Sequence, residues 1–433
     1  MISEFYGNTK KIIEYRFAMS VRNEILNWIE QEKDQIIRFL QDFIKAKSPN
    51  PPGDTVLAAQ KISDLLNKHN APIRFVSPQP NMPNLIGSIN GPSEGRHLVL
   101  NGHIDVFPVS ENAKNEGWIT PPWSGKIINN KIYGRGSTDM KCGTSASIWT
   151  YIILNYFKNS IRGKLTLTCV SDEETFGPWG ARWLMENEPD VLGDCCLNGE
   201  PSSPFTIRYA EKGLLWLTFK IQTDGSHGAY THLSKSATRI AANLIKRLES
   251  LEDLELEISE DLLEAQKSAA SHFDKGMGVG AAEIAPKVTL NIGTINGGLK
   301  NNMVPSDCIF EADIRLPIGS KVEQIEREIS NILEDFPEAS MEKNMLNPPS
   351  HCSPDGDMMQ ILQNNVDALK GFKPAPVVSL GGTDARLWRY KNIPAYVYGP
   401  APTGMGSINE NVPVEDYLHV VRTHALSAFD YLS

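Results

Sequence analysis

Cysteine is scarce in this chain, with only six in 433 residues. No two cysteines form a CxxC pair, and Cys195 and Cys196 are adjacent. The spacing therefore predicts neither a disulfide framework nor a zinc knuckle. We expect the cysteines to be buried thiols.

Long apolar runs are also missing. The longest, around Ile148–Phe157, contains Asn155 and is too short to cross a bilayer. Near the N-terminus, Lys10, Lys11 and Glu14 interrupt the apolar residues, so no signal-peptide core is present. We therefore expect a cytoplasmic protein that has no membrane partner.

The chain has no excess of positive charge. It contains 42 lysines and arginines against 52 aspartates and glutamates, a formal net charge of −10. An acidic balance argues against binding to nucleic acid or to an anionic membrane, and it leaves a small-molecule substrate as the expected partner. Hydrophobic residues make up 41% of the chain, enough for a substantial core, and the length predicts about two or three domains.

Strands and helices alternate along much of the chain. Apolar residues recur at helical spacing over residues 22–47, before the helix-breaking segment SPNPPGD. Short apolar strands are predicted over 85–89, 98–100 and 165–170, with helices over 55–69 and 146–157. This alternation is typical of an α/β domain with a mixed, mostly parallel central sheet.

The pattern changes after about residue 212. A strand, a helix, two strands and a second helix follow one another, as in a self-contained α+β unit of the ferredoxin-like kind. We predict a catalytic domain formed by residues 1–210 and 343–433, interrupted by a smaller inserted domain over residues 211–342.

Two motifs place a histidine and acids next to predicted secondary structure. NGHIDV carries His103 and Asp105 after an apolar run, and GRGSTDMKCG carries Asp139 before a helix. Taken alone, each motif is more simply explained by a side chain that caps a strand or a helix.

Two further motifs place carboxylates after strands. SDEETFG carries Asp172, Glu173 and Glu174, and NGEPSS carries Glu200. Adjacent carboxylates repel one another unless cations or protons compensate, and ligands of α/β sheets bind beyond the carboxyl ends of the strands. The four motifs together therefore favour a metal centre over a solvated run of charges. One glutamate could bind metal while its neighbour accepts a proton from water.

The order of GHIDV, GRGSTDMKCG, DEE and GEP resembles the metallopeptidase family that includes acetylornithine deacetylase, succinyl-diaminopimelate desuccinylase, aminoacylases and carboxypeptidase G-type enzymes. The resemblance covers roughly residues 30–430. It implies a metal-dependent hydrolase that cleaves an amide-type C–N bond in a small carboxylate-bearing substrate, such as an N-acyl amino acid. A dipeptidase or carboxypeptidase, another C–N hydrolase such as a deaminase or deformylase, and a non-catalytic metal-bearing binding protein remain alternatives.

The resemblance also implies a set of metal and catalytic residues. Two divalent ions are implied, zinc or else manganese or cobalt. The implied metal ligands are His103, Asp139 as a bridge, Glu174 and Glu200. Glu173 would be the general base, and Asp105 would orient His103.

Further roles are implied for the inserted domain and for a glycine-rich loop. His227, in GSHGAYTHLSKSA, would help to stabilise the oxyanion, often across the interface of a homodimer formed by the inserted domain. Asn302 and Arg315 would hold the substrate, although Arg315 could equally form an ordinary strand-end salt bridge. The implied substrate loop, in GGTDAR, contains Gly381, Gly382 and Thr383.

The sequence departs from the family pattern at one expected metal ligand. The final histidine of the family falls on Gly406, which has no side chain to bind metal. Glu410 or His351 could take its place, the site could hold one metal tightly and another weakly or work with one, or the protein could be catalytically inactive. Because His103 and the carboxylates are present, we expect hydrolysis to be retained.

Overall fold

The computed structural model describes residues 18–110, 112–113 and 117–433. Residues 1–17, on which the expectation of no signal peptide rests, lie outside this described part. Within the described part, no helix is both long enough and apolar enough to cross a membrane.

A nine-stranded mixed sheet forms the centre of the larger domain, in the order β1-β2-β6-β3-β7-β17-β8-β15, with β16 paired to β8. Its strands are β1 (Arg74–Val76), β2 (Asn84–Asn90), β3 (His97–His103), β6 (Lys164–Val170), β7 (Cys195–Asn198), β8 (Thr206–Glu211), β15 (Ser350–His351), β16 (Ala375–Ser379) and β17 (Ala395–Val397). The middle strands β6, β3, β7 and β17 are parallel, whereas β1, β2 and β15 pair antiparallel. The expected mixed, mostly parallel sheet is confirmed.

Helices cover both faces of this sheet. Alternate residues of a strand point to opposite faces, so Leu98 and Leu100 join one core while Val99 joins the other. The first face is covered by residues 18–31, which are helical, and by α2 (Lys33–Lys45), α3 (Val56–Lys68), α4 (Lys141–Tyr156), α10 (Asp357–Lys370) and α12 (Val414–Leu432). The second face is covered by α5 (Ala181–Asn187) and α11 (Ala385–Tyr390).

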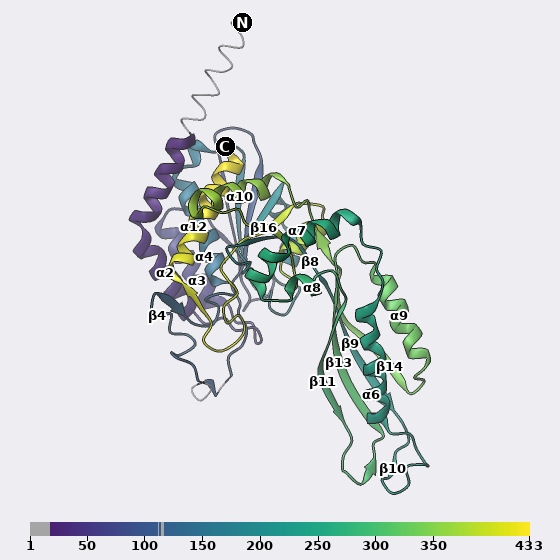
Figure 1. Cartoon of the computed structure of the whole chain (residues 1–433). Coiled ribbons are helices and arrows are strands. Elements are labelled where there is room, and N and C mark those ends of the chain that lie inside the picture. Colours follow the sequence, from purple (N-terminus) through teal and green to yellow (C-terminus); the bar gives the residue numbers. More distant parts are fainter. Residues whose placement is uncertain (1–17, 111, 114–116) are drawn as a thin grey trace.

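A second, four-stranded antiparallel sheet builds the inserted domain, in the order β11-β13-β9-β14. Its strands are β9 (Gly213–Gln222), β11 (Thr289–Gly297), β13 (Asp307–Leu316) and β14 (Ala339–Asn347). Helices α6 (Ala237–Leu248) and α9 (Val322–Glu334) pack on one face of it. Figure 1 shows this domain projecting away from the larger one, with the short strand β10 (Ser226–His227) at its far end. Strand β10 pairs with β12 (Met303–Val304).

A helical hairpin within the inserted segment returns to the larger domain. Helices α7 (Glu260–Met277) and α8 (Ala281–Ile284) lie next to β16 (Figure 1), and Phe273 and Ala281 share a small core with Val377 of that strand. The sequence pattern gave no expectation of this contact, because it joins segments about a hundred residues apart.

A small three-stranded sheet connects the end of the chain to the turn that carries Asp139. Strand β18 (Asn411–Pro413) pairs with β5 (Lys131–Tyr133), which pairs with β4 (Lys126–Ile128). This pairing places the segment from Gly404 to Glu410 beside the residues that lead into α4, and Gly134 N donates a hydrogen bond to Glu410 O at 3.0 Å.

Candidate metal centre and active site

The parallel strands bring the predicted motifs to one edge of the sheet. His103 ends β3 and is level with Val170, after which β6 continues into the glutamate pair. On the other side of β3, β7 ends at Asn198, two residues before Glu200. Because the carboxyl ends of parallel strands share one edge, residues far apart in sequence meet there.

His103, Asp139 and Glu200 form a compact cluster. His103 Nε2 lies 3.1 Å from Glu200 Oε1 and 3.3 Å from Asp139 Oδ1. One ligand atom from each residue lies within 4.8 Å of the others, the arrangement expected of groups that hold a metal ion. Imidazole nitrogen and carboxylate oxygen are both ligands that zinc and related divalent ions take in proteins.

The ring of His103 is oriented by its second nitrogen. Nδ1 lies 2.9 Å from the carbonyl oxygen of Asp105, which can only accept a hydrogen bond, so Nδ1 carries the proton. This leaves the Nε2 lone pair directed at the cluster whenever the ring is neutral. The Asp105 carboxylate accepts hydrogen bonds from Asn50 Nδ2 at 2.9 Å and from Glu174 N at 3.1 Å.

Glu173 and Glu174 complete the acidic lining of the site. Glu173 Oε2 lies 3.9 Å from His103 Nε2, and Glu173 Oε1 lies 3.8 Å from Arg386. Neither Glu173 Oε1 nor Glu174 Oε1 has a hydrogen-bond partner among the residues that the structure describes, although both atoms are buried. Such atoms are costly unless another group satisfies them.

The pKa values of the cluster are raised because its carboxylates are buried close to one another. Burial and the nearby carboxylates raise the pKa of Glu173 and of Glu174 well above the usual range. Burial, followed by the Asp139 carboxylate, raises the pKa of Glu200 to about 7. Burial alone would lower the pKa of His103, but the surrounding carboxylates raise it well above its usual value. The residues therefore fit a bound cation, which would offset these charges.

Asp172, the first of the three adjacent acids, holds the turn. Its backbone has a φ of 70°, a left-handed value that is unusual for a residue with a side chain. Its carboxylate accepts hydrogen bonds from Asn50, from Thr175 Oγ1 at 2.7 Å and from Trp179 N at 3.1 Å. Because these bonds fix the turn, the following Glu173 is presented to the cluster.

Glu410 plays a comparable part for the turn that carries Asp139. Its Oε1 accepts hydrogen bonds from Thr138 N at 2.8 Å and from Asp139 N at 3.1 Å, and its Oε2 accepts one from Arg135 at 2.7 Å. Burial raises the pKa of Glu410 to about 7. The Glu410 carboxylate is thus already engaged by protein donors.

Gly406 lies close to the site, and within the described residues no imidazole occupies the position of the missing histidine ligand. Its carbonyl oxygen accepts a hydrogen bond from Arg135 at 3.0 Å, and an added Cβ would stand 3.5 Å from the ring of Phe107. His351, the other candidate substitute, lies on β15 and is not among the residues that line the active-site cavity. The Asp139–Glu174 side therefore has two carboxylates and, within the described residues, no histidine.

Hydrogen bonds to Glu211 hold the glycine-rich loop in place. Thr383 N donates a hydrogen bond to Glu211 Oε2 at 2.9 Å, and Thr383 Oγ1 donates to Glu211 Oε1. Arg389 forms a buried ion pair with Glu211 at 2.9 Å. Gly381 and Gly382 stay at the cavity surface, with no atom within 4 Å of a Cβ added at Gly381.

A cavity of about 580 Å³ opens over the cluster. Its polar wall contains Asp139, Glu173, Glu174, Glu200, Arg208, Arg315 and the loop from Gly381 to Thr383. Its apolar wall contains Phe107, Phe176, Trp216, Phe273, Met277, Leu380, Pro402 and Met405. The inserted domain and α7 thus share this cavity with the larger domain. Arg315 already pairs with Asp313 at 2.8 Å.

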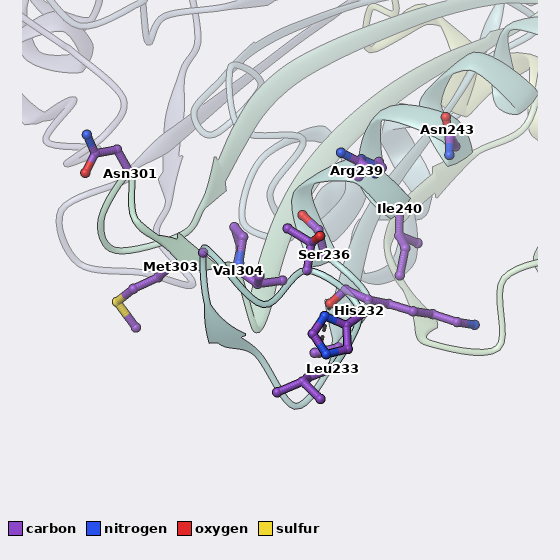
Figure 2. A pocket seen from close by; sticks show the side chains of 14 residues that line it. His232, Leu233, Ser236, Arg239, Ile240, Asn243, Asn301, Met303 and Val304 are labelled. Carbon is purple, nitrogen blue, oxygen red and sulfur yellow. Dashed lines mark hydrogen bonds between the residues drawn. The ribbon is translucent and has the colours of Figure 1, made fainter.

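His227 and Asn302 lie away from this cavity. His227 is exposed on β10, and Gly228 N donates a hydrogen bond to the Asn302 carbonyl oxygen at 2.7 Å. Neither residue lines the cavity above the metal cluster. A second cavity, of about 650 Å³, lies nearby in the inserted domain. Figure 2 shows the residues that line it, among which His232 and Leu233 lie close together.

Several residues around the site were given no role by the sequence pattern. Asn50 belongs to the proline-rich segment that the sequence pattern marks only as a helix breaker, yet it bridges Asp105 and Asp172. Arg135 lies in GRGSTDMKCG and Arg386 lies in GGTDAR, but neither motif indicates which side chains these arginines contact. Asp384 is buried beside Arg386, and burial raises its pKa to about 6. The GGTDAR motif, which contains Asp384 and Arg386, was the sequence pattern that could have pointed to these two residues.

Comparison with known proteins gives consistent relatives. The family model described as "Peptidase family M20/M25/M40" matches residues 99–429. Succinyl-diaminopimelate desuccinylase of Cereibacter sphaeroides is 27% identical over 345 residues, covering 77% of this chain and 83% of that protein. N-formyl-4-amino-5-aminomethyl-2-methylpyrimidine deformylase of Halalkalibacterium halodurans is 25% identical over 436 residues, covering 94% of this chain and 96% of that protein.

Solved structures share the fold. An M20 family metallo-carboxypeptidase from Sulfolobus solfataricus has a TM-score of 0.78 at 19% identity, covering 92% of this chain and 99% of that one. Human carnosine dipeptidase 1 has a TM-score of 0.73 at 16% identity, covering 95% of this chain and 99% of that one. The match of the family model to most of the chain confirms the expected membership and the expected class of enzyme, a hydrolase of C–N bonds. The chain belongs to peptidase family M20/M25/M40.

Proposed function

We propose that this chain removes an acyl group from a small carboxylate-bearing amide, such as an N-acyl amino acid, with the help of a bound divalent metal. The buried cluster of His103, Asp139 and Glu200 beside Glu173 is the observation that carries this proposal. Two relatives, named as a desuccinylase and a deformylase, support a deacylase over a peptidase.

His103, Asp139 and Glu200 would hold the first metal. When bound, the metal would polarise the scissile carbonyl and lower the pKa of water. Asp105 keeps the proton on Nδ1 of His103, so that Nε2 is available as a ligand.

Glu173 would act as the general base. Its Oε1 is buried without a hydrogen-bond partner in the described residues, and its Oε2 faces the cluster. A carboxylate in this position can take a proton from the attacking water and return it to the leaving amine. Arg386, 3.8 Å away, would keep Glu173 oriented during the transfer.

Asp139 and Glu174 would hold a second metal more weakly than the first. The free Oε1 of Glu174 supports a ligand role, and the absence of an imidazole at Gly406 removes one donor. Because Glu410 is engaged by three protein donors, we do not assign it as the replacement. Zinc fits this donor set, and the oxygen-rich second position suits manganese or cobalt as well.

The substrate would lie between the glycine-rich loop and the inserted domain. Arg315 and the loop of Gly381, Gly382 and Thr383 line the same cavity as the metal cluster. An arginine fork can hold a carboxylate with two hydrogen bonds, and loop amides can hold an oxygen of the substrate.

A homodimer would complete the site. His227 and Asn302 lie at the far end of the inserted domain and do not line the cavity above the metal cluster of the same chain. They could therefore serve the active site of a second copy. The edge strand β11 is largely exposed, with Ile295 53% accessible, and could pair with its equivalent in the second copy. His227 would then help to stabilise the oxyanion.

A cytoplasmic location belongs to the same proposal. All six cysteines are free thiols, five of them buried, as is usual in a reducing compartment.

The test is a hydrolysis panel of N-acyl amino acids, N-formyl amines and dipeptides, run on one preparation with and without chelator. We expect turnover of at least one N-acyl compound that stops with chelator and returns with zinc, manganese or cobalt. Binding without hydrolysis across the whole panel would instead support a non-catalytic metal-bearing protein.

A further inference from the structure

Among the described residues, Arg208 is a buried cation that no carboxylate contacts directly, although the charges of Glu200, Glu211 and Asp139 act on it from farther away. It lies on β8, is 8% exposed, and lines the cavity above the metal cluster. Its Nε has no hydrogen-bond partner among the described residues, and its Nη2 contacts only the sulfur of Met277, at 3.8 Å. Within the described ranges, no carboxylate lies within 4.0 Å of its guanidinium.

The neighbouring arginines differ from Arg208 in this respect. Arg389 pairs with Glu211 at 2.9 Å, and Arg315 pairs with Asp313 at 2.8 Å. A guanidinium stays charged even when burial lowers its pKa, as it does for Arg208. The more distant carboxylates offset only part of this charge, and a buried guanidinium without a hydrogen-bonded anion is destabilising, so its position in a cavity calls for an anion that arrives with a ligand.

The cavity that Arg208 lines also has an apolar wall. Phe176 and Trp216 meet edge to face with their ring centroids 5.9 Å apart, and Phe273 and Met277 of α7 line the same cavity. An apolar group of the ligand would gain about 25 cal/mol for each Å² that it buries against these side chains. The site therefore suits a carboxylate attached to an apolar or aromatic group.

The wall that α7 provides is fixed to the larger domain. Beyond α7, Lys212, which directly follows β8, donates hydrogen bonds from Nζ to the carbonyl oxygens of Ile284 in α8 and of Lys287, at 2.9 and 2.6 Å. Lys275 Nζ lies 3.7 Å from the ring centroid of Phe205. Phe273 of α7 also shares a small core with Val377 of β16, so α7 is held where Met277 contacts the Arg208 guanidinium.

We propose that Arg208 is a specificity-determining residue that binds a second carboxylate of the substrate, carried next to an apolar group, while the scissile amide lies at the metal cluster. This inference rests on the proposed function for the placement of the amide. This carboxylate is additional to the scissile acyl group at the metal cluster, and it could belong to the acyl chain, as in a dicarboxylic half-amide, or to the amino acid that is released.

Equilibrium binding tests the anion site without turnover. The probes are benzylsuccinate, which has two carboxylates, and 3-phenylpropanoate, which has one, measured calorimetrically on the metal-loaded full chain. One carboxylate of either probe can face the metal, so the difference between the probes reports on the second carboxylate. The variants are Arg208→Met, Arg208→Lys and, as a control, Arg247→Met, whose guanidinium is exposed on the inserted domain.

We expect wild-type protein and Arg247→Met to prefer benzylsuccinate by about 10- to 100-fold, the range for hydrogen bonds to a charged group. Arg208→Met should bind both probes equally, and Arg208→Lys should keep part of the preference. A preference that survives in Arg208→Met would overturn the inference. So would a loss of bound metal in that variant, because Arg208 would then serve to balance the carboxylate cluster.

Kinetics distinguish the two sources of the carboxylate. N-succinyl-phenethylamine carries it on the acyl side, and N-acetylphenylalanine carries it on the amine side. The KM of the matching compound should rise in Arg208→Met with little change in kcat, and a KM that rises for neither would count against the inference. If the wild type hydrolyses neither compound, the calorimetric comparison alone decides the anion site, and the proposed function fails only if no N-acyl compound of the hydrolysis panel is turned over.

Discussion

Arg135 donates a hydrogen bond to Glu410 at 2.7 Å, with the side chains only 6% and 1% exposed. The same carboxylate accepts the backbone N–H groups of Thr138 and Asp139, so this pair holds the turn that presents Asp139 to the metal cluster. Glu410 thus stabilises the turn that carries Asp139 and does not replace the missing histidine as a metal ligand.

Glu410→Gln should weaken metal binding. The amide would leave Arg135 buried without its counter-charge and loosen the turn of Asp139. Loss of such supporting contacts typically costs about 10- to 100-fold in metal affinity. Competition with a chelator measures this, with the exposed Glu415→Gln as the control. Unchanged metal affinity in Glu410→Gln would show that the turn does not depend on the pair.

Gly406→His should strengthen the second metal position. The added Cβ would meet only the Phe107 ring, at 3.5 Å, an ordinary contact. The φ of 70° at this residue is left-handed, so the histidine should cost about 1 kcal/mol of stability. We expect one tightly bound metal per chain in the wild type and two in the variant. Elemental analysis after dialysis measures both, and two tightly bound metals in the wild type would contradict the weak second position.

Stability should fall in mild acid because of His424. This side chain is fully buried in α12, its Nε2 donates a hydrogen bond to the Tyr398 carbonyl oxygen at 2.7 Å, and burial lowers its pKa to about 4. In the unfolded chain the pKa is about 6.5. Between those values the unfolded state binds more protons, so the free energy of unfolding decreases as the pH falls from about 6.5 to 4.

Thermal unfolding at pH 7 and pH 5 tests this expectation. The buried carboxyl groups with raised pKa values, such as Glu410, shift stability in the opposite sense, so the comparison is between variants. His424→Gln should lose less stability on acidification than the wild type, and the exposed His272→Gln should behave as the wild type does. Equal losses in all three proteins would mean that His424 does not titrate as its burial requires.

The sequence was informative where the relevant pattern is local. His103, Asp139, Glu173 and Glu200 each follow a recognisable strand or turn, and parallel strands bring such ends together by geometry alone. The alternation of predicted strands and helices likewise indicated the central sheet, and the change of pattern after about residue 212 indicated the inserted α+β unit. The expected roles of these residues remain predictions, because the structure shows their placement and not their chemistry.

The rest depends on contacts between distant segments. Asn50 reaches both Asp105 and Asp172, and α7 returns to β16, only because the fold places them there. Arg208 looks like any strand residue in the sequence, and only the fold shows that no carboxylate of the described residues contacts it directly. Gly406 signalled a missing ligand, but the engagement of Glu410 by Arg135 could not be read from spacing.

Turnover and metal content of Glu173→Gln, measured on the same sample, test the central claim most directly. The variant should keep the metal content of the wild type, because His103, Asp139 and Glu200 are untouched, and should lose about 10²- to 10⁴-fold in kcat. Glu342→Gln, an exposed glutamate paired with Lys220, should match the wild type in both measurements. Full turnover by Glu173→Gln would contradict a catalytic role for Glu173 and with it the proposed mechanism.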